Sequence, residues 1–250
     1  AKLVKNLAKE DSRYSLLLEL ISEVDIKYPF SPLLITFRHG DIRKTFPVTC
    51  SPMPYLVEAE KTEGEKRAFY VCDAMRNICE HIYQPYIKTL WILSYLRNGN
   101  LPPTNEPSYG NMLDVCFKNL PKKYHNLIES NAVIMRNSPS HNILNWNDET
   151  DSIILKDKEK RIEISVDELL EKLRSMQQIS SFTISRVGQL YMFRICGRDG
   201  IMEKIYDSLP AFFSNDKMRI QLAKTELYNF VVNILKIRGV LVDESKALSN

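Results

Sequence analysis

Apolar residues recur at alternating three- and four-residue steps along two long stretches of the chain, which is the pattern of an amphipathic helix. One helix is expected over residues 4–24, and the longest is expected from Lys66 to Arg97. Pro85 should kink this longer helix or divide it in two, because proline has no amide proton to donate. The apolar positions of the longer helix are Ala68, Cys72, Met75, Cys79, Ile82, Tyr86, Leu90 and Leu93.

Two shorter helices are predicted in the middle of the chain. The first covers Asn111–Asn119, and the second begins at Pro121, a residue type that suits the first turn of a helix. We expect the second helix to end near Asn137 or Ser138, because Pro139 disfavours helical geometry in the residue before it.

Downstream, alternating apolar and polar residues predict a small β-hairpin. Its strands are Ile153–Lys156 and Arg161–Ile164. The segment Ser165–Glu168 then has the spelling of a capping box and opens another helix. A break in that helix is expected near Ser180 and Ser181.

Other elements are predicted nearer the two ends of the sequence. Prolines punctuate two extended runs, Leu33–Phe37 and Ile42–Val48, which suggests another hairpin. The charged segment Glu58–Glu65 is interpreted as a linker and a domain boundary. Two further helices are expected at about Gly200–Leu209 and Asp216–Ile237.

Composition narrows the class of protein. The 250 residues are 44% hydrophobic and 26% charged, as in ordinary soluble domains, and no run of about 18 apolar residues predicts a membrane span. Five cysteines without a C-x-x-C pair favour free thiols in a reducing cytoplasm over a structural zinc site. The net charge of +3 permits an RNA partner. Glycine-rich phosphate loops and the motifs H-E-x-x-H and G-x-S-x-G do not occur.

The strongest candidate for chemistry is the segment Arg136–His141, where a helix should end. Arginine is always charged and can donate to two phosphate oxygens at once, while histidine moves protons near neutral pH. These two roles are sufficient for RNA cleavage by the ribose 2′-hydroxyl. The plainer alternative is that His141 bonds the last helix carbonyls and Arg136 is a surface charge.

The sequence Arg76–His81 has the same R-N-x-x-x-H spelling and is a rival site. It lies inside the predicted long helix, where five residues turn the side chain by about 140°. Arg76 and His81 therefore should not meet unless the helix is broken there, and they are interpreted as flank residues. His39 and His125 are expected to be exposed.

The segment Arg136-Asn137-Ser138-Pro139-Ser140-His141 resembles the R-x4-6-H motif of HEPN domains. The downstream hairpin and the helix that opens with "ISVDELLEKL" are similar to that family as well, so the resemblance covers roughly residues 66–176. It implies a bundle of four or five helices that commonly dimerises, with Arg136 and His141 of both protomers lining one cleft. It also implies RNA cleavage without metal to a 2′,3′-cyclic phosphate. The tyrosine found two residues after the histidine in antitoxin-paired members is replaced by Ile143.

The resulting prediction is a mainly α-helical, cytoplasmic protein, a HEPN-like bundle with small β-hairpin insertions. Residues 1–58 would form an N-terminal extension, 59–196 the bundle and 197–250 a C-terminal helical extension. The expected function is a metal-independent endoribonuclease without cofactors, a toxin or antiviral defence effector that acts as a homodimer with a possible antitoxin or regulatory partner. The alternative is a non-catalytic module that binds nucleic acid or protein. Catalysis is assigned to Arg136 and His141, and substrate binding to Asn137, Ser138, Lys122 and Lys123.

Two further features have two interpretations each. The hairpin cations would hold an RNA backbone or, because acidic residues alternate with them, would simply be solvated. Trp146 would stack on a base or pack against the bundle. The cations in question are Lys156, Lys158, Lys160 and Arg161.

Overall fold

The computed structural model describes residues 2–28, 35, 52–103, 105–138 and 146–197. The chain divides into two compact units, Ala1–Gly188 and Gln189–Asn250. Several predicted features fall outside the described residues. These are the hairpin over residues 33–37 and 42–48 (apart from Ile35), the two helices after residue 199, His39 and His141.

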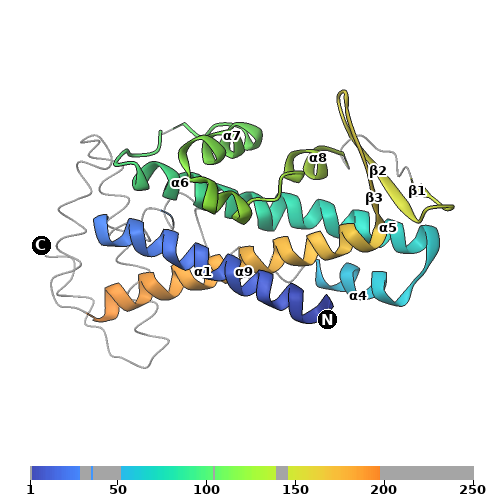
Figure 1. Cartoon of the computed structure of the whole chain (residues 1–250), viewed down its shortest axis with the longest axis horizontal. Coiled ribbons are helices and arrows are strands. Elements are labelled where there is room, and N and C mark those ends of the chain that lie inside the picture. The colour runs from blue at the N-terminus through green and yellow to red at the C-terminus, as the bar shows by residue number, and fades with distance from the viewer. Residues whose placement is uncertain (1, 29–34, 36–51, 104, 139–145, 198–250) are drawn as a thin grey trace, which may run out of the picture. The chain divides into compact units, whose positions relative to one another are not determined.

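The described part of the chain is mostly helical, as predicted (Figure 1). Its α-helices are α1 (Lys2–Lys27), α4 (Met53–Lys61), α5 (Gly64–Asn77), α6 (Gln84–Arg97), α7 (Tyr109–Asn119), α8 (Ala132–Asn137) and α9 (Val166–Gly197). A π-helical segment, η1 (Ile78–Tyr83), joins α5 to α6, and a 3₁₀ helix, η2 (Lys122–Leu127), precedes α8. None of the helices that the structure describes is long and apolar enough to cross a bilayer.

The predicted long helix over residues 66–97 is confirmed as the continuous run α5–η1–α6, and its apolar face is buried apart from the half-buried Cys72. The disturbance expected at Pro85 takes the form of the π-helical segment directly before it. Within this segment the helix is wider, so that Gln84 N–H donates to Cys79 O, five residues back. This pattern fits Pro85, which has no amide proton for the usual bond and crowds the carbonyl four residues earlier.

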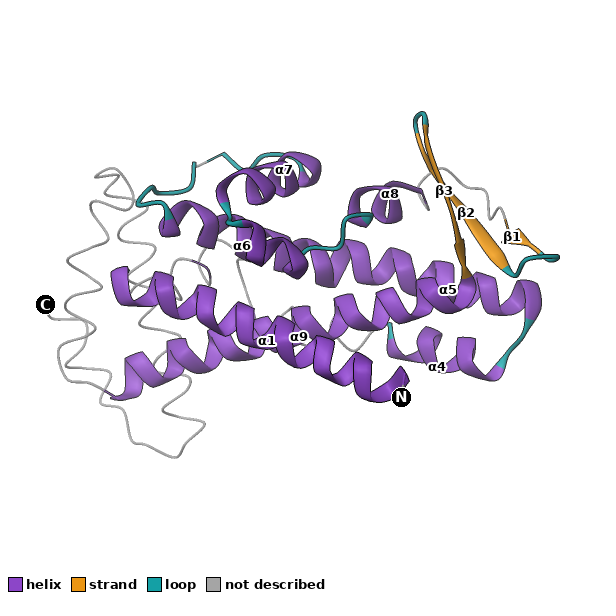
Figure 2. Ribbon diagram, viewed as in Figure 1, coloured by secondary structure: helices purple, strands orange, loops and turns teal. Residues whose placement is uncertain are grey.

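The predicted small hairpin is also confirmed. It consists of β2 (Ser152–Asp157) and β3 (Lys160–Ser165), and the short strand β1 (Trp146–Asn147), which the sequence did not suggest, completes an antiparallel sheet of order β1-β2-β3. Figure 2 shows the two longer strands beside α8. Ser165 caps the start of α9 as expected, because its hydroxyl accepts a hydrogen bond from Glu168 N at 3.1 Å.

Two predictions about helix boundaries are wrong. The charged segment 58–65 is not a linker, because α4 continues to Lys61 and packs on α5 with Ala59 buried. Helix α9 is not broken near residue 180. Ser180 and Thr183 donate their hydroxyl hydrogens to carbonyls four residues back, each at 2.6 Å, so the helix itself accommodates these polar side chains.

The prediction of one helix that begins at Pro121 is wrong. The structure has two separate elements there, η2 and α8. Residues 128–131 lie between them, and Glu129 in this segment bonds to Tyr83 and Lys172. The expected exposure of His125 is also wrong: the ring is half-buried, its Nε2 lies 3.0 Å from Leu120 O, and its edge faces Phe117.

Candidate functional site

Arg136 lies on α8, a helix of only six residues. Isolated helices of this length are not stable in water, so the position of Arg136 depends on the contacts that hold α8 in place. Three of its residues, Ala132, Ile134 and Met135, are buried. The helix packs on α5, η1 and β2.

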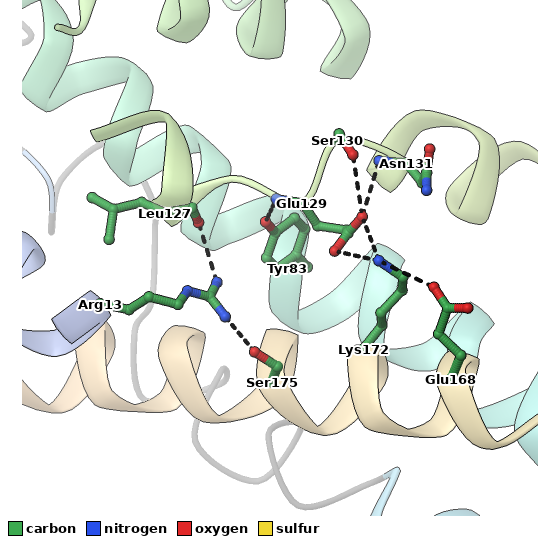
Figure 3. Close-up of polar contacts among 9 residues, drawn as sticks. All are labelled: Arg13, Tyr83, Leu127, Glu129, Ser130, Asn131, Glu168, Lys172 and Ser175. Atoms are coloured by element: carbon green, nitrogen blue, oxygen red, sulfur yellow. Dashed lines mark hydrogen bonds and ion pairs between the residues drawn. The ribbon is translucent and has the colours of Figure 1, made fainter. Parts of the chain in front are cut away.

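Glu129 anchors the chain just before α8 (Figure 3). Its backbone N–H donates to the buried hydroxyl of Tyr83 at 2.7 Å. Its carboxylate accepts the N–H of Asn131 at 3.2 Å, which satisfies a free amide at the start of the helix. Lys172 of α9 lies 3.3 Å from both carboxylate oxygens and 3.8 Å from Glu168. The backbone and side chain of this one residue therefore join η1, the start of α8 and α9.

The carbonyl of Leu127 is a second anchor, at the end of η2. It accepts a hydrogen bond from the hydroxyl of Tyr86 at 2.9 Å and another from Arg13 of α1 at 3.4 Å. The guanidinium of Arg13 also donates to the hydroxyl of Ser175 on α9 (Figure 3). The segment between η2 and α8 is thus tied to α1, α6 and α9.

The other end of α8 is tied to the hairpin. The helix ends at Asn137, as predicted, and Ser138 is its C-terminal cap residue. The hydroxyl of Ser138 accepts a hydrogen bond from Lys156 N at 3.1 Å, and the amide of Asn137 donates to Asp157 Oδ2 at 3.0 Å. Both predicted substrate-binding side chains therefore hold the helix against β2.

The prediction that Pro139 moves Ser138 out of helical geometry is wrong. Ser138 keeps helical geometry, with φ −56° and ψ −45°, although Pro139 follows it. Its hydrogen bond to Lys156 N supplies a local force that holds this conformation. The helix still ends here, since Pro139 has no amide proton to continue the ladder.

Arg136 itself is half-buried, and its guanidinium carbon lies 5.3 Å from the centre of the Tyr109 ring. Its Nε is buried without a hydrogen-bond partner in the described part of the chain. No carboxylate among the described residues pairs with it, whereas Arg67, Arg97 and Arg174 each pair with an acidic side chain. A cation that has lost water without gaining an anion is costly, and a ring contact offsets only about 0.5–2 kcal/mol of this.

The groups next to Arg136 stay neutral at physiological pH. Burial raises the pKa of the Tyr109 phenol well above its usual value, although the positive charge of Arg136 opposes this shift. Burial likewise raises the pKa of the Cys79 thiol, again against the influence of Arg136. Neither of these two neighbours therefore supplies a negative charge to the guanidinium of Arg136.

The two predicted backbone-binding lysines lie on η2, which packs on α1. Lys123 is engaged there: its Nζ lies 2.6 Å from Glu19 and 3.6 Å from Glu23, and the bond to Glu19 raises its pKa. Lys122 is exposed. Within the described residues, no hydrogen bond, ion pair or ring contact joins either lysine to α8.

In the rival copy of the motif, Arg76 and His81 are both exposed. Arg76 is in the last turn of α5, and His81 is inside the π-helical segment. The rotation of about 140° expected for five residues of a regular α-helix therefore does not hold for Arg76 and His81. A π turn brings residues that are five apart closer to one face of the helix. This pair stays a rival.

Trp146 packs against the bundle. Its Nε1 donates to Asp151 Oδ1 at 3.0 Å, and its ring is close enough to Gly64 that an added Cβ would lie 3.8 Å away. Arg67 bridges Asp151 and Asp167 at 3.6 and 2.5 Å, which fixes this end of the sheet to α5 and α9.

Sequence reasoning missed Tyr109, Glu129 and Lys172, which surround or support α8. Each contacts a partner that is 27 to 46 residues away in the chain, so helical periodicity gives no signal for it. Among the residues that the structure describes, no three acidic, histidine or cysteine side chains gather as metal ligands would. Comparisons of the chain with protein-family models, with curated proteins and with solved structures found no match.

Proposed function

We propose that the protein is a metal-independent endoribonuclease of the HEPN type, with Arg136 and His141 as its catalytic residues. The observation that carries the proposal is the half-buried guanidinium of Arg136, which pairs with no carboxylate among the described residues, on a helix that is held at both ends. His141 follows five residues later in the chain. Such a guanidinium is prepared for a phosphate, because anion binding replaces the hydrogen bonds that burial removed.

The proposed reaction is an intramolecular transesterification. The ribose 2′-oxygen loses its proton and bonds to the adjacent phosphorus, while the bond from phosphorus to the 5′-oxygen of the next nucleotide breaks. The products are a 2′,3′-cyclic phosphate and a 5′-hydroxyl that gains a proton. His141 transfers protons, and Arg136 stabilises the charge that grows on the phosphoryl oxygens. A homodimer would bring two such pairs to one cleft, so that one histidine acts as base and the other as acid.

In this proposal Asn137 and Ser138 are positioning residues, since their polar atoms bond to β2. Asn137 and Ser138 would thereby fix the direction in which the side chain of Arg136 extends from α8. Lys122 and Lys123 would have a lesser part, because Lys123 is already paired with α1. A cytoplasmic toxin or defence effector, controlled by an antitoxin or regulatory partner, is the biological role that suits such an activity.

The alternative is a HEPN-like module that binds nucleic acid without cutting it. The exposed cations of the hairpin favour this second function as much as the first, because they concern binding alone. The two functions differ in whether the 2′-hydroxyl of a bound RNA is consumed.

The test is cleavage of single-stranded RNA in EDTA by the full chain and four variants: Arg136→Ala, His141→Ala, Arg76→Ala and His81→Ala. The proposal expects EDTA-resistant cleavage with cyclic phosphate ends, lost in the first two variants and kept in the last two. Loss in the Arg76 and His81 variants alone would move the active site to the rival copy. RNA that is bound and left intact by the full chain would support the non-catalytic alternative.

A further inference from the structure

Two cations lie directly opposite each other on the hairpin. Lys156 of β2 and Arg161 of β3 are paired residues in the antiparallel register, and both are exposed. Side chains alternate between faces along each strand, so Lys156 and Arg161 share the face opposite the one that carries Ile153 and Leu155. Ile153 and Leu155 are buried, which makes the face of Lys156 and Arg161 the outer one.

This pairing is unfavourable unless an anion binds. Directly opposite residues have Cβ atoms about 4.5–5.5 Å apart, and like charges at that separation destabilise a sheet. Neither Lys156 nor Arg161 has an ion pair among the residues that the structure describes. A carboxylate opposite either cation would have removed the repulsion.

Two of the acidic residues interleaved with these cations, Glu163 and Asp157, bond to other groups. Glu163, on the same face, accepts hydrogen bonds from Ser152 at 2.5 Å and Thr150 at 3.3 Å. Asp157 belongs to the other face, where it accepts the Asn137 amide. Glu163 lies opposite Ile154, one pair further along the outer face, so neither of these carboxylates lies directly opposite Lys156 or Arg161.

The hairpin cations are also linked to Arg136. The backbone N–H of Lys156 donates to Ser138, and the next residue, Asp157, holds Asn137. In Figure 2 the tip of the hairpin projects beyond the helices around it. The hairpin that carries these cations is thus joined to the end of α8 through β2, by the backbone of Lys156 and by Asp157 of the opposite face.

We propose that Lys156 and Arg161 form a binding site for the phosphate backbone of single-stranded RNA, on the hairpin that β2 joins to the end of α8. The inference deepens the proposed function and depends on it for the identity of the polymer. A phospholipid surface is a poorer ligand, since membrane-bound surfaces add apolar side chains to their cations. The large exposed apolar residues of the described chain lie outside the hairpin: Leu18, Ile26, Met53, Val57, Phe69 and Leu101.

The test measures binding without cleavage. A fluorescent single-stranded RNA is titrated in EDTA with the His141→Ala protein, alone or with Lys156→Ala and Arg161→Ala together. The matched control carries Lys66→Ala and Lys118→Ala, which remove the same charge from exposed positions on α5 and α7. Two lost phosphate contacts should lower affinity by about 25-fold at 0.1 M salt and reduce the logarithmic salt slope by about 1.4. The control should bind like the parent, and melting curves should show all three proteins folded.

Parent-like binding by the hairpin variant, or equal losses in hairpin and control variants, would overturn the inference. So would hairpin-dependent binding to phosphatidylserine vesicles in place of RNA. None of these results affects cleavage by Arg136 and His141, which the EDTA assay measures separately. Conversely, hairpin-dependent RNA binding by a protein that cuts no RNA supports this inference and contradicts the proposed catalysis.

Discussion

The chain contains the same spelling, R-N-x-x-x-H, in two places with different surroundings. In the copy that begins at Arg136, the arginine is half-buried above an aromatic ring, on a helix of six residues that other elements hold at both ends. In the copy that begins at Arg76, the arginine and His81 are exposed on a long helical run. The two copies thus share the chemical groups of the motif and differ in burial and in tertiary anchoring.

The asparagines that follow the two arginines show the same difference. The amide of Asn77 donates to Asp73 O, four residues back in its own helix, at 2.9 Å. The amide of Asn137 donates to Asp157 on the hairpin, 20 residues away, at 3.0 Å. Asn77 therefore makes only a local bond within its own helix, whereas Asn137 joins a short helix to a sheet.

The largest expected effect is on catalysis. Arg136→Ala should lower the rate of RNA cleavage by about 10²–10³-fold, the usual cost of losing one donor to transition-state charge. Arg136→Lys should restore only part of this, because an ammonium cannot donate to two oxygens in parallel. Arg76→Ala should cleave like the parent. Single-turnover rates in EDTA measure all three, and equal losses at Arg136 and Arg76 would remove the distinction between the copies.

The next effect concerns the anchor before α8. Lys172→Met should lower the free energy of unfolding by about 2 kcal/mol, because the partly buried carboxylate of Glu129 loses its counter-charge. The side chains of Lys172 and Glu129 are 25% and 17% exposed. The control is Lys61→Met, whose pair with Glu58 is 62% and 44% exposed and should cost under about 0.5 kcal/mol. Urea titrations measure the free energy of unfolding of both variants. Similar losses in the two would show that the ion pair of Glu129 with Lys172 contributes little.

A third prediction uses pH to probe the buried side of Arg136. Burial raises the pKa of the Cys79 thiol above its ordinary value of 9.0. The folded protein therefore retains this proton while the unfolded chain loses it, so stability is full below pH 9 and falls as pH rises further. Between pH 8 and 10 the thiol should account for about 1.4 kcal/mol of the decline. In Cys79→Ala the decline should shrink by that amount, and an unchanged pH dependence would mean that Cys79 is accessible to water.

A smaller effect should separate the two asparagines. Asn137→Ala should cost about 1 kcal/mol of unfolding free energy, because it removes a partly buried bond to a charged acceptor. Asn77→Ala should be close to neutral, since alanine's better helix propensity offsets the lost local bond. Thermal denaturation of the two variants at one pH provides the measurement. A cost at Asn77 equal to that at Asn137 would mean that the hairpin tie adds nothing to the fold.

Much of the fold could be predicted because it follows from local patterns. The α5–η1–α6 run, the β2–β3 hairpin and the start of α9 at Ser165 each have their signal within a few adjacent residues. The site could be predicted only in part. The end of the helix after Arg136 is a local feature, but the ring of Tyr109 reaches Arg136 from another helix. Such long-range pairs decide burial, and one sequence does not encode them in any periodicity.

The errors have the same physical origin. Charged residues in α4 suggested a linker, but Leu56 and Ala59 gain enough burial against α5 to form a helix. The single helix expected from Pro121 is interrupted where Leu127 O and Glu129 N bond to side chains from α1, η1 and α6. Tertiary hydrogen bonds at those positions replaced the intrahelical ones that local propensity favours.

The central claim is that the guanidinium of Arg136 is an open anion site and that of Arg76 is not. The most direct measurement is the NMR signal of each arginine Nε–H, assigned with Arg136→Lys and Arg76→Lys, during titration with a 2′-O-methyl RNA that cannot be cleaved. The account predicts a saturable shift of the Arg136 signal and an Arg76 signal that stays in place. A shift of the Arg76 signal alone, or an Arg136 signal that does not change as RNA is added, would contradict this prediction.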